Sequence, residues 1–171
     1  MLHIYYGNGK GKTTAAVGLA VRACGSGLKT GFFQFLKNGS SSEISVLNSI
    51  NNLSIYCCDK CDKFTFTMNE KELAEVTIQH NEMMKKAEEL IKNNDIQLIV
   101  LDEFLDAYNK NLIDREFADN LINYSISRCE VVLTGREPTE EQKKSADYLT
   151  EMKAVKHPYN NGISARKGIE Y

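Results

Sequence analysis

The sequence predicts an α/β domain in which a mostly parallel β-sheet is covered by helices on both faces. Short apolar runs alternate along the chain with longer segments whose apolar residues repeat every three or four positions. The length of 171 residues suits one hydrophobic core, and no internal repeat or Pro-rich linker interrupts the pattern. We therefore expect residues 1–171 to form a single domain whose ligands bind at the carboxyl ends of the strands.

The first elements are predicted to be a strand, a loop and a helix. Residues 2–6 form a short apolar run, and residues 12–24 carry alanine, valine and leucine at helical spacing before two glycines end the pattern. Residues 30–36 are short and aromatic-rich, which is typical of a strand buried on both faces. The polar stretch 38–42 opens a short helix, and residues 53–56 are a third strand candidate.

The second half continues the alternation of strands and helices. Asn69 is placed to cap the longest predicted helix. The apolar positions of that helix are Leu73, Val76, Met83, Met84, Ala87, Leu90 and Ile91. Residues 96–101 form a continuous apolar run of the kind found in central parallel strands. Residues 131–134 form another such run, after a predicted helix around residues 117–126.

The loop after the first predicted strand, G-N-G-K-G-K-T-T, predicts a phosphate-binding loop and a fold like that of P-loop NTPases. Its three glycines, two lysines and two threonines exceed what a plain turn needs. Glycines free backbone N–H groups to face a triphosphate, and the following helix adds its positive N-terminus. The usual first glycine would stand one position earlier, at Tyr6, so the loop is a variant. The residues predicted to bind ATP are Gly7, Asn8, Gly9, Lys10, Gly11, Lys12, Thr13 and Thr14.

Two carboxylates end the apolar strand predicted at residues 96–101. Asp102 is expected to hold Mg²⁺, directly or through water, beside the hydroxyl of Thr13. Glu103 is expected to ligate the metal or to contact the ribose. An acidic pair can also simply end a strand, but the phosphate loop elsewhere in the chain favours the metal site.

Two arginines are further candidates for holding ATP. Arg136 follows a Thr-Gly pair at the end of a predicted strand, where ligands bind in parallel sheets, and a solvated loop arginine is the alternative. Arg22 lies near the end of the helix that follows the phosphate loop, where a surface salt bridge is an equally good interpretation. In a hydrolase, Glu103 would orient the attacking water and Arg136 would face the γ-phosphate.

Composition excludes several classes of function. A net charge of −2 with mixed signs offers no basic stripe for a nucleic-acid backbone, so we expect no nucleic-acid partner. No apolar run reaches the length of a membrane span, and the N-terminus lacks the basic region and cleavage site of a signal peptide. We therefore expect a cytoplasmic protein without a membrane partner.

Three of the five cysteines, Cys57, Cys58 and Cys61, cluster as C-C-D-K-C. A structural zinc site would need a second pair of ligands, and Cys24 and Cys129 lie in segments predicted to be a helix and a strand. In the cytosol we expect reduced, unpaired thiols rather than a metal site or disulfides.

Two phenylalanines, Phe64 and Phe66, lie in a polar loop at residues 59–69 and have no periodic apolar partners. They either anchor the loop onto the domain or contact a ligand. The pattern alone favours neither.

Together these segments resemble the P-loop type of corrinoid adenosyltransferases, also called cob(I)alamin or cob(I)yrinic acid a,c-diamide adenosyltransferases. The resemblance covers nearly the whole chain and includes the displaced first glycine of the loop. The matching segments that follow the loop are Q-F-L-K at 34–37, V-L-D-E at 100–103, T-G-R at 134–136 and the C-terminal segment 155–171, V-K-H-P-Y onward to G-I-E-Y.

The resemblance implies transfer of the 5′-deoxyadenosyl group of ATP to the Co(I) of a reduced corrinoid, with release of triphosphate. It implies that Lys12 and Glu103 are catalytic, while no general base is needed because Co(I) is itself a strong nucleophile. Arg22 matches an arginine that helps to hold the nucleotide. Phe64 and Phe66 match two aromatic residues that replace the lower axial ligand of cobalt, which makes Co(II) easier to reduce.

The resemblance further implies Mg²⁺ as cofactor, a homodimer, an electron-donor protein such as a flavodoxin, and a place in adenosylcobalamin biosynthesis or salvage. Many members carry an N-terminal segment that covers the site, whereas this chain begins with its first strand, so we expect other loops to close the site. Two other functions stay open on the residues alone: an ATP hydrolase or kinase that yields ADP, and a non-catalytic ATP-sensing module.

Overall fold

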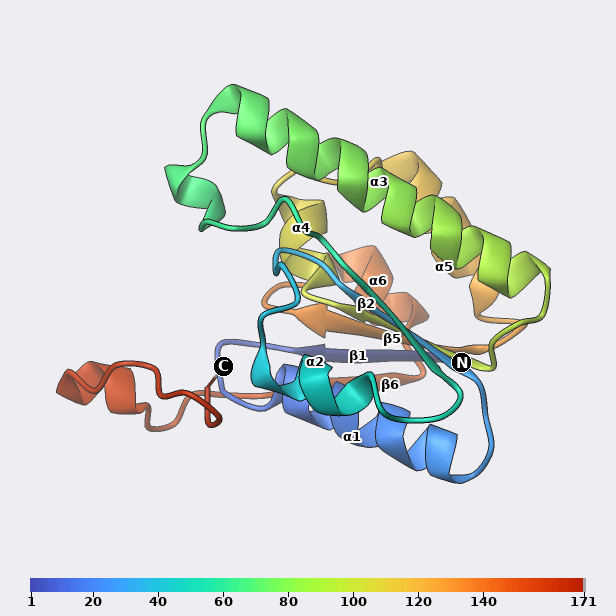
Figure 1. The fold of residues 1–171 in the computed structure, drawn as a ribbon, viewed down its shortest axis with the longest axis horizontal. Helices are drawn as coiled ribbons and strands as arrows, with labels where there is room; N and C mark the ends of the chain where they lie inside the picture. The colour runs from blue at the N-terminus through green and yellow to red at the C-terminus, as the bar shows by residue number, and fades with distance from the viewer. Residues whose placement is uncertain (171) are drawn as a thin grey trace.

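The protein folds as a six-stranded β-sheet between two layers of helices, in a computed structural model that describes residues 1–170 (Figure 1). Tyr171, the last residue of the C-terminal segment that carries the resemblance, lies outside the described residues. None of the helices found in residues 1–170 has the length and apolar character needed to cross a membrane. The predicted α/β class is confirmed, and the sheet is parallel throughout.

The elements alternate along the chain as expected. The strands are β1 (Leu2–Tyr6), β2 (Thr30–Gln34), β3 (Leu53–Cys57), β4 (Leu98–Asp102), β5 (Glu130–Gly135) and β6 (Tyr148–Glu151). The α-helices are α1 (Lys12–Gly25), α2 (Ser42–Leu47), α3 (Glu70–Lys92), α4 (Phe104–Asn109), α5 (Arg115–Ser125) and α6 (Glu140–Ser145). Two 3₁₀ turns are η1 (Thr65–Thr67) and η2 (Pro158–Asn161).

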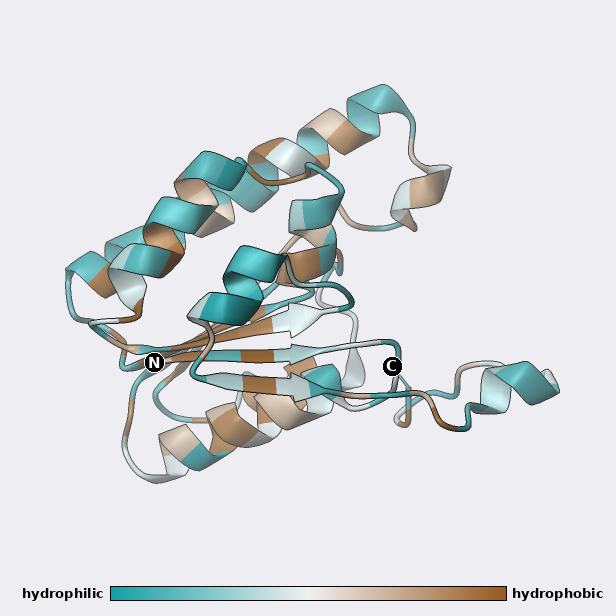
Figure 2. Cartoon of the chain, turned by 180° about the vertical axis from the view of Figure 1, so that it is seen from behind, coloured by the Kyte–Doolittle hydropathy of each residue, from teal (hydrophilic) through white to brown (hydrophobic). Residues whose placement is uncertain are grey.

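The order of strands decides which loops meet. The sheet runs β3-β2-β4-β5-β1-β6, so β5 lies between β1 and β4. Because every pairing is parallel, the carboxyl ends of these strands share one edge. The turn η1 and the C-terminal segment also project from this edge, toward which the strand arrows point in Figures 1 and 2.

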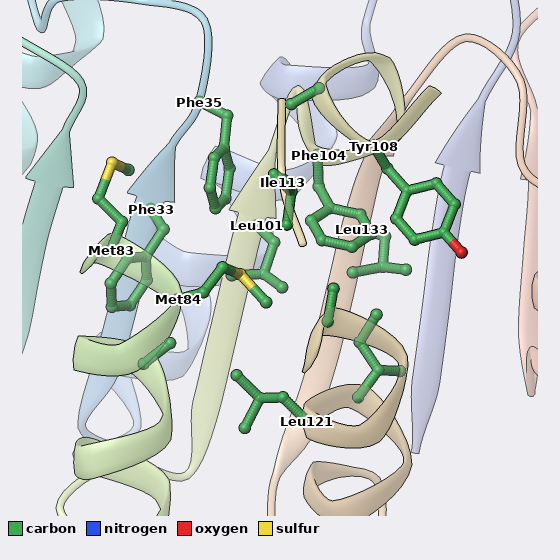
Figure 3. Packing of buried hydrophobic residues seen from close by; sticks show 14 of the residues in the cluster. Phe33, Phe35, Met83, Met84, Leu101, Phe104, Tyr108, Ile113, Leu121 and Leu133 are labelled. Carbon is green, nitrogen blue, oxygen red and sulfur yellow. The ribbon is translucent and has the colours of Figure 1, made fainter. Parts of the chain in front are cut away.

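The larger core cluster lies between the sheet and the helices α3, α4 and α5 (Figure 3). Leu101 of β4 and Phe35, which directly follows β2, pack there with Met84 of α3 and Leu121 of α5, and all four are less than 5% exposed. The periodic apolar face of α3 was predicted, and a capping box at Asn69 starts this helix.

The second cluster lies on the opposite face of the sheet, beneath α1 and α2. Small residues on α1, Ala16 and Ala20, are fully buried and let the helix approach Phe32 and Val100 of the sheet closely. This close packing holds the start of α1, and with it the preceding loop, at the end of β1.

Some predicted boundaries shift in the structure. Strand β2 ends at Gln34, two residues before the predicted end, and Leu36 adopts a left-handed backbone with φ of 57°. Strand β4 begins at Leu98 rather than at residue 96 and includes Asp102. The Phe64–Phe66 segment, predicted as loop, contains the 3₁₀ turn η1.

One strand and two short α-helices among residues 1–170 were missed by the sequence-based prediction, as was the 3₁₀ turn η2. Strand β6 is exposed along its whole length at the sheet edge, so it shows no alternation of apolar and polar residues. Helix α6 is polar, although the capping box formed by Thr139 and Gln142 was available as a signal. Helix α4 has one turn and a half and follows Glu103 directly.

Candidate functional site

The glycine-rich loop joins β1 to α1 and is held by the segment after β6. Gly7 has a φ of +111°, and a Cβ atom there would lie 2.5 Å from the carbonyl oxygen of Met152. The N–H of Gly9 donates to that same oxygen at 2.7 Å. Glycine is therefore required at position 7 by both backbone conformation and space.

The ammonium group of Lys12 lies inside this loop. Its Nζ donates to the carbonyl oxygen of Gly9 at 2.8 Å. Burial lowers the pKa of Lys12, and the nearby carboxylates of Glu103 and Asp106 oppose the shift. A bound polyphosphate would provide a closer anionic partner for this half-buried ammonium.

Asp102 is fully buried at the end of β4 and is held by several hydrogen bonds. Its Oδ1 accepts from the hydroxyls of Thr13 at 2.9 Å and Thr134 at 2.7 Å, and its Oδ2 accepts from Gln34 at 3.2 Å. The Nζ of Lys37 lies 3.7 Å from Oδ2. These contacts join the loop helix to β2, β4 and β5 and fix the orientation of one carboxylate.

Glu103 has an unusual backbone and a shifted acidity. It adopts φ of 60° and ψ of 16°, a left-handed conformation that is uncommon outside glycine, and its N–H donates to Thr134 Oγ1 at 2.9 Å. Burial, and next the charge of Asp102, raise the pKa of Glu103 to about 7, while Lys37 at 3.9 Å opposes the shift. The strained backbone turns this carboxyl group toward the pocket beside the buried aspartate.

The oxygen atoms gathered here suit a hard divalent cation. Thr13, Asp102 and Glu103, the three predicted Mg²⁺ ligands, meet at the ends of α1 and β4. Gln34 adds a buried Oε1 that has no hydrogen-bond partner within residues 1–170. Hydroxyl, carboxylate and amide oxygens are the donors that Mg²⁺ accepts, so the residues present fit this ion.

An open pocket of about 630 Å³ lies in front of the loop. Residues 8–14 form one wall, residues 41–43 at the start of α2 form a second, and residues 168–170 close part of the third side, with Lys37 and Glu103 at the base. This volume falls within the range that holds a ligand of nucleotide size. All predicted loop residues except Gly7 line the pocket.

Sequence reasoning missed three charged residues of this pocket. Lys37 lies between the two carboxylates, and Glu43 accepts from Gln34 at 3.3 Å. Glu170 pairs with Lys10 at 3.1 Å, which brings the C-terminal segment over the loop. Lys37 and Glu170 belong to segments that carry the family resemblance, so the resemblance was a usable signal for both.

The two predicted arginines do not line the pocket. Arg22 is exposed on the last turn of α1, where its positive charge interacts favourably with the negative end of the helix dipole. The side chain of Arg136 is 77% exposed, with Nε 3.9 Å from Asp106, while its carbonyl oxygen accepts from the N–H of Gly7 at 3.0 Å. Binding of ATP by these two guanidinium groups stays a prediction.

The two phenylalanines project from the same edge of the sheet but lie outside this pocket. Phe64 and Phe66 are 75% and 81% exposed, and their rings stack with centroids 5.4 Å apart and an interplanar angle of 11°. The hydroxyl of Thr65 between them accepts from Lys110 at 3.0 Å. A pair of stacked, exposed rings offers an apolar face to a flat ligand.

None of the five cysteines forms a disulfide within residues 1–170. Cys58 and Cys61 are not isolated, however, because His80 of α3 lies against them in the core. The sequence pattern did not single out this histidine, since it lies nineteen residues after Cys61 within an ordinary amphipathic helix.

The raised pKa of Glu103 predicts how its removal affects stability. Because the folded state holds this proton more tightly than the unfolded chain does, the contribution of Glu103 to stability is lost as the pH rises from about 4.5 to about 7. Without metal or nucleotide, the free energy of unfolding of Glu103→Gln should therefore be higher than that of the parent by roughly 1–3 kcal/mol above pH 7. Near pH 4.5 the two free energies of unfolding should be equal. Urea unfolding with EDTA at several pH values measures this difference. A constant difference between the two proteins across that range would contradict the assigned acidity.

Comparison with protein families gives a match over the whole chain. The model of a family described as "ATP:corrinoid adenosyltransferase BtuR/CobO/CobP" matches residues 1–171. A corrinoid adenosyltransferase of Pseudomonas aeruginosa is 33% identical over 175 residues, which cover 100% of this chain and 83% of that protein. The corrinoid adenosyltransferases of a Sinorhizobium species and of Escherichia coli are 31% and 29% identical, covering 96% and 98% of this chain and 77% and 84% of theirs.

Solved structures support the fold at much lower sequence identity. The flagellar accessory protein FlaH of Methanocaldococcus jannaschii superposes with a TM-score of 0.54 at 11% identity, covering 88% of this chain and 69% of its own. EssC (ATPases 2 and 3) of Geobacillus thermodenitrificans gives 0.51 at 15% identity, covering 99% of this chain and 36% of its own. These likenesses concern the arrangement of strands and helices alone.

Proposed function

The chain belongs to the ATP:corrinoid adenosyltransferase family and is an ATP-dependent transferase of adenosylcobalamin biosynthesis. From this premise we propose that the pocket at the glycine-rich loop binds ATP so that its 5′-deoxyadenosyl group passes to the Co(I) of a reduced corrinoid, with release of triphosphate. The observation that carries this proposal is the joining of the loop, Lys12 and a buried carboxylate at one edge of the sheet.

The reaction needs alignment and charge stabilisation rather than a base. The cobalt electron pair forms a bond to C5′ of ATP, the C5′–O5′ bond breaks, and its electrons leave with the triphosphate. Lys12 and the loop amides stabilise the charge that develops on this leaving group. Glu103 and Lys37 line the pocket between the glycine-rich loop and α2, where they can orient the ribose and the phosphate chain of ATP.

Mg²⁺ would be held by Thr13, Asp102 and Glu103, and when bound it supplies positive charge to the phosphate oxygens. This site is preorganised, because hydrogen bonds from Thr13, Thr134 and Gln34 already orient the carboxylate of Asp102. Ionisation of Glu103 supplies a second negative charge to the site, and Lys37 stabilises that charge from 3.9 Å.

The exposed rings Phe64 and Phe66 are proposed to contact the corrinoid. Their apolar surface would cover the lower face of the macrocycle and keep an axial donor from cobalt. Support comes from their exposure, their parallel stacking, and their place on a loop at the same edge of the sheet as the pocket.

Several finer features of this function rest on the resemblance to the family. We propose that the enzyme acts in the cytoplasm as a homodimer and receives electrons for Co(II) from a donor protein such as a flavodoxin. We also keep Arg22 as a proposed nucleotide contact, although this residue is exposed on α1 outside the pocket of one chain.

One incubation tests the proposed reaction. The purified protein is mixed with ATP, Mg²⁺ and chemically reduced cobalamin in the dark under nitrogen. We expect the absorption spectrum of a light-sensitive cobalt–carbon bond to appear together with stoichiometric triphosphate.

The alternative functions give other products in the same assay. Formation of ADP without alkylated corrinoid would indicate a hydrolase or kinase that uses the same loop. ATP binding without any turnover in the presence of Co(I) would indicate a sensing module. Either result would overturn the proposed transfer.

A further inference from the structure

Two thiols and an imidazole converge in the core away from the nucleotide pocket. The sulfur atoms of Cys58 and Cys61 and a ring nitrogen of His80 all lie within 4.8 Å of one another. Cys58 and His80 are fully buried, and Cys61 is 7% exposed. The cysteines come from the turn after β3 and the histidine from α3, so the cluster joins the two ends of the segment that contains η1.

The hydrogen bonds of His80 leave Nε2 as the basic nitrogen. Nδ1 lies 3.1 Å from the carbonyl oxygen of Leu112, which can only accept, so Nδ1 carries the proton. Nε2 accepts from the N–H of Leu36 at 3.3 Å and lies 3.8 Å from Cys61 Sγ. A ring that donates one N–H to a backbone carbonyl and points its other nitrogen at thiols has the orientation of a metal ligand.

The two sulfur atoms lie next to each other in the core. The thiol of Cys61 donates to Cys58 Sγ at 2.8 Å, and the turn places both sulfurs on the side of the segment that faces His80. Thiolate is the form that binds metal ions, and a bound cation at this point would stabilise it.

Gln79 provides an oxygen beside the same cluster. Its Oε1 lies 3.2 Å from Cys58 Sγ and also accepts from the N–H of Lys60 at 3.0 Å. Its Nε2 donates to Asp59, which holds the amide with its oxygen toward the thiols. The amide oxygen of Gln79 thus lies beside one of the two sulfurs of the cluster.

We propose that Cys58, Cys61 and His80 form a zinc site, with the Gln79 amide oxygen or a water as fourth ligand. Zn–S distances near 2.3 Å and Zn–N distances near 2.0 Å place tetrahedral ligand atoms roughly 3.5–3.8 Å apart. The spacing of 3.8 Å between Cys61 and His80 already fits, while the two sulfurs must separate by about 1 Å. Thiolate and imidazole donors in this ratio suit Zn²⁺ among common divalent ions.

A redox disulfide is the less suitable use of this C-x-x-C pair. Thiol–disulfide exchange needs an accessible attacking sulfur, and Cys58 is fully buried beneath the turn.

The expected consequence of zinc is a fixed base for the loop that carries Phe64 and Phe66. Cys61 lies three residues before Phe64, and His80 belongs to the helix that follows this loop. One ion would therefore tie both ends of the segment 58–80 together. The site lies in the core cluster against α3, whereas the nucleotide loop packs with α1 on the other side of the sheet.

Metal content and spectroscopy test this site directly. The chain is purified without a polyhistidine tag under reducing conditions, and elemental analysis should find about one zinc per chain. Replacement by Co²⁺ should give the visible bands of a tetrahedral ion and charge-transfer bands from thiolate. Chelation should raise hydrogen–deuterium exchange in residues 58–69 and leave residues 7–14 unchanged.

Single substitutions separate ligands from bystanders. Cys58→Ser and His80→Gln should weaken zinc binding by more than about 100-fold, beyond the usual effect of changes outside the ligand sphere. Cys57→Ser is the matched control, because Cys57 adjoins Cys58 yet packs against the opposite core cluster, and this variant should keep the metal.

Two results would overturn the proposal. One is a reduced parent chain that takes up neither Zn²⁺ nor Co²⁺ supplied in excess. The other is a Co²⁺ spectrum without thiolate charge transfer. Because both are measured on the parent chain, they decide the matter even if a variant with a buried substitution fails to fold.

Discussion

Replacing Lys12 by alanine is expected to lower kcat by about 10²- to 10³-fold or more, because the change removes the full positive charge that faces the departing triphosphate. The ammonium already lies in the loop, 2.8 Å from the carbonyl oxygen of Gly9, so its position is set before ATP arrives. The side chain belongs to the pocket wall and not to either core cluster. Stability should therefore change by less than about 1 kcal/mol.

The measurement combines triphosphate release with ATP binding by calorimetry and with urea unfolding. Lys71→Ala is a suitable control, since Lys71 is 87% exposed on α3 and makes only a weak ion pair with Glu75. The control should keep parental turnover. A Lys12→Ala enzyme with near-parental turnover would remove the assignment of the loop as the triphosphate site.

Phe64→Ala and Phe66→Ala are expected to lower activity by at least tenfold when Co(II) corrinoid is supplied with a protein reductant, and to spare most of it when Co(I) is supplied directly. The asymmetry follows from the proposed role of the rings in removing an axial donor, a step that preformed Co(I) no longer needs. Both rings are more than 70% exposed and, within residues 1–170, stack on no other ring than each other, so their loss should cost little stability.

Electron paramagnetic resonance gives an independent measurement of the same step. Co(II) corrinoid bound together with ATP should show a four-coordinate signal in the parent that shrinks in both variants. Ile78→Ala is the control, because it removes an exposed apolar side chain from α3 rather than from the Phe64–Phe66 segment, and it should leave the signal unchanged. Equal losses in the two activity assays, or a four-coordinate signal without the rings, would mean that the phenylalanines only pack the loop.

The strongest sequence signals were those with a local physical cause. The first strand, Leu2–Tyr6, has the predicted bounds, and α1 begins at the predicted Lys12, because the glycines of the loop separate them sharply. The cap at Asn69 likewise predicted the start of α3. Where no local signal existed, as in the exposed edge strand β6, prediction failed.

Site residues were predicted when they belonged to a motif, and missed when only chain packing brings them together. Thr13 and Asp102 were predicted to meet, and a hydrogen bond of 2.9 Å joins them. Thr134, which binds the same carboxylate, was quoted only as part of a matching segment, because its role depends on β5 lying between β1 and β4.

The sequence by itself determined the α/β class, the glycine-rich loop, the acidic strand end and the family, since each depends on residue types at fixed short spacing. The tertiary structure decided the rest: the left-handed backbone of Glu103, the position of Lys37 between two carboxylates, and the approach of His80 to Cys58 and Cys61. The side-chain contacts among these features join segments that only folding brings together. Burial and strand order set their distances, and neither quantity is encoded in the spacing of residues along the chain.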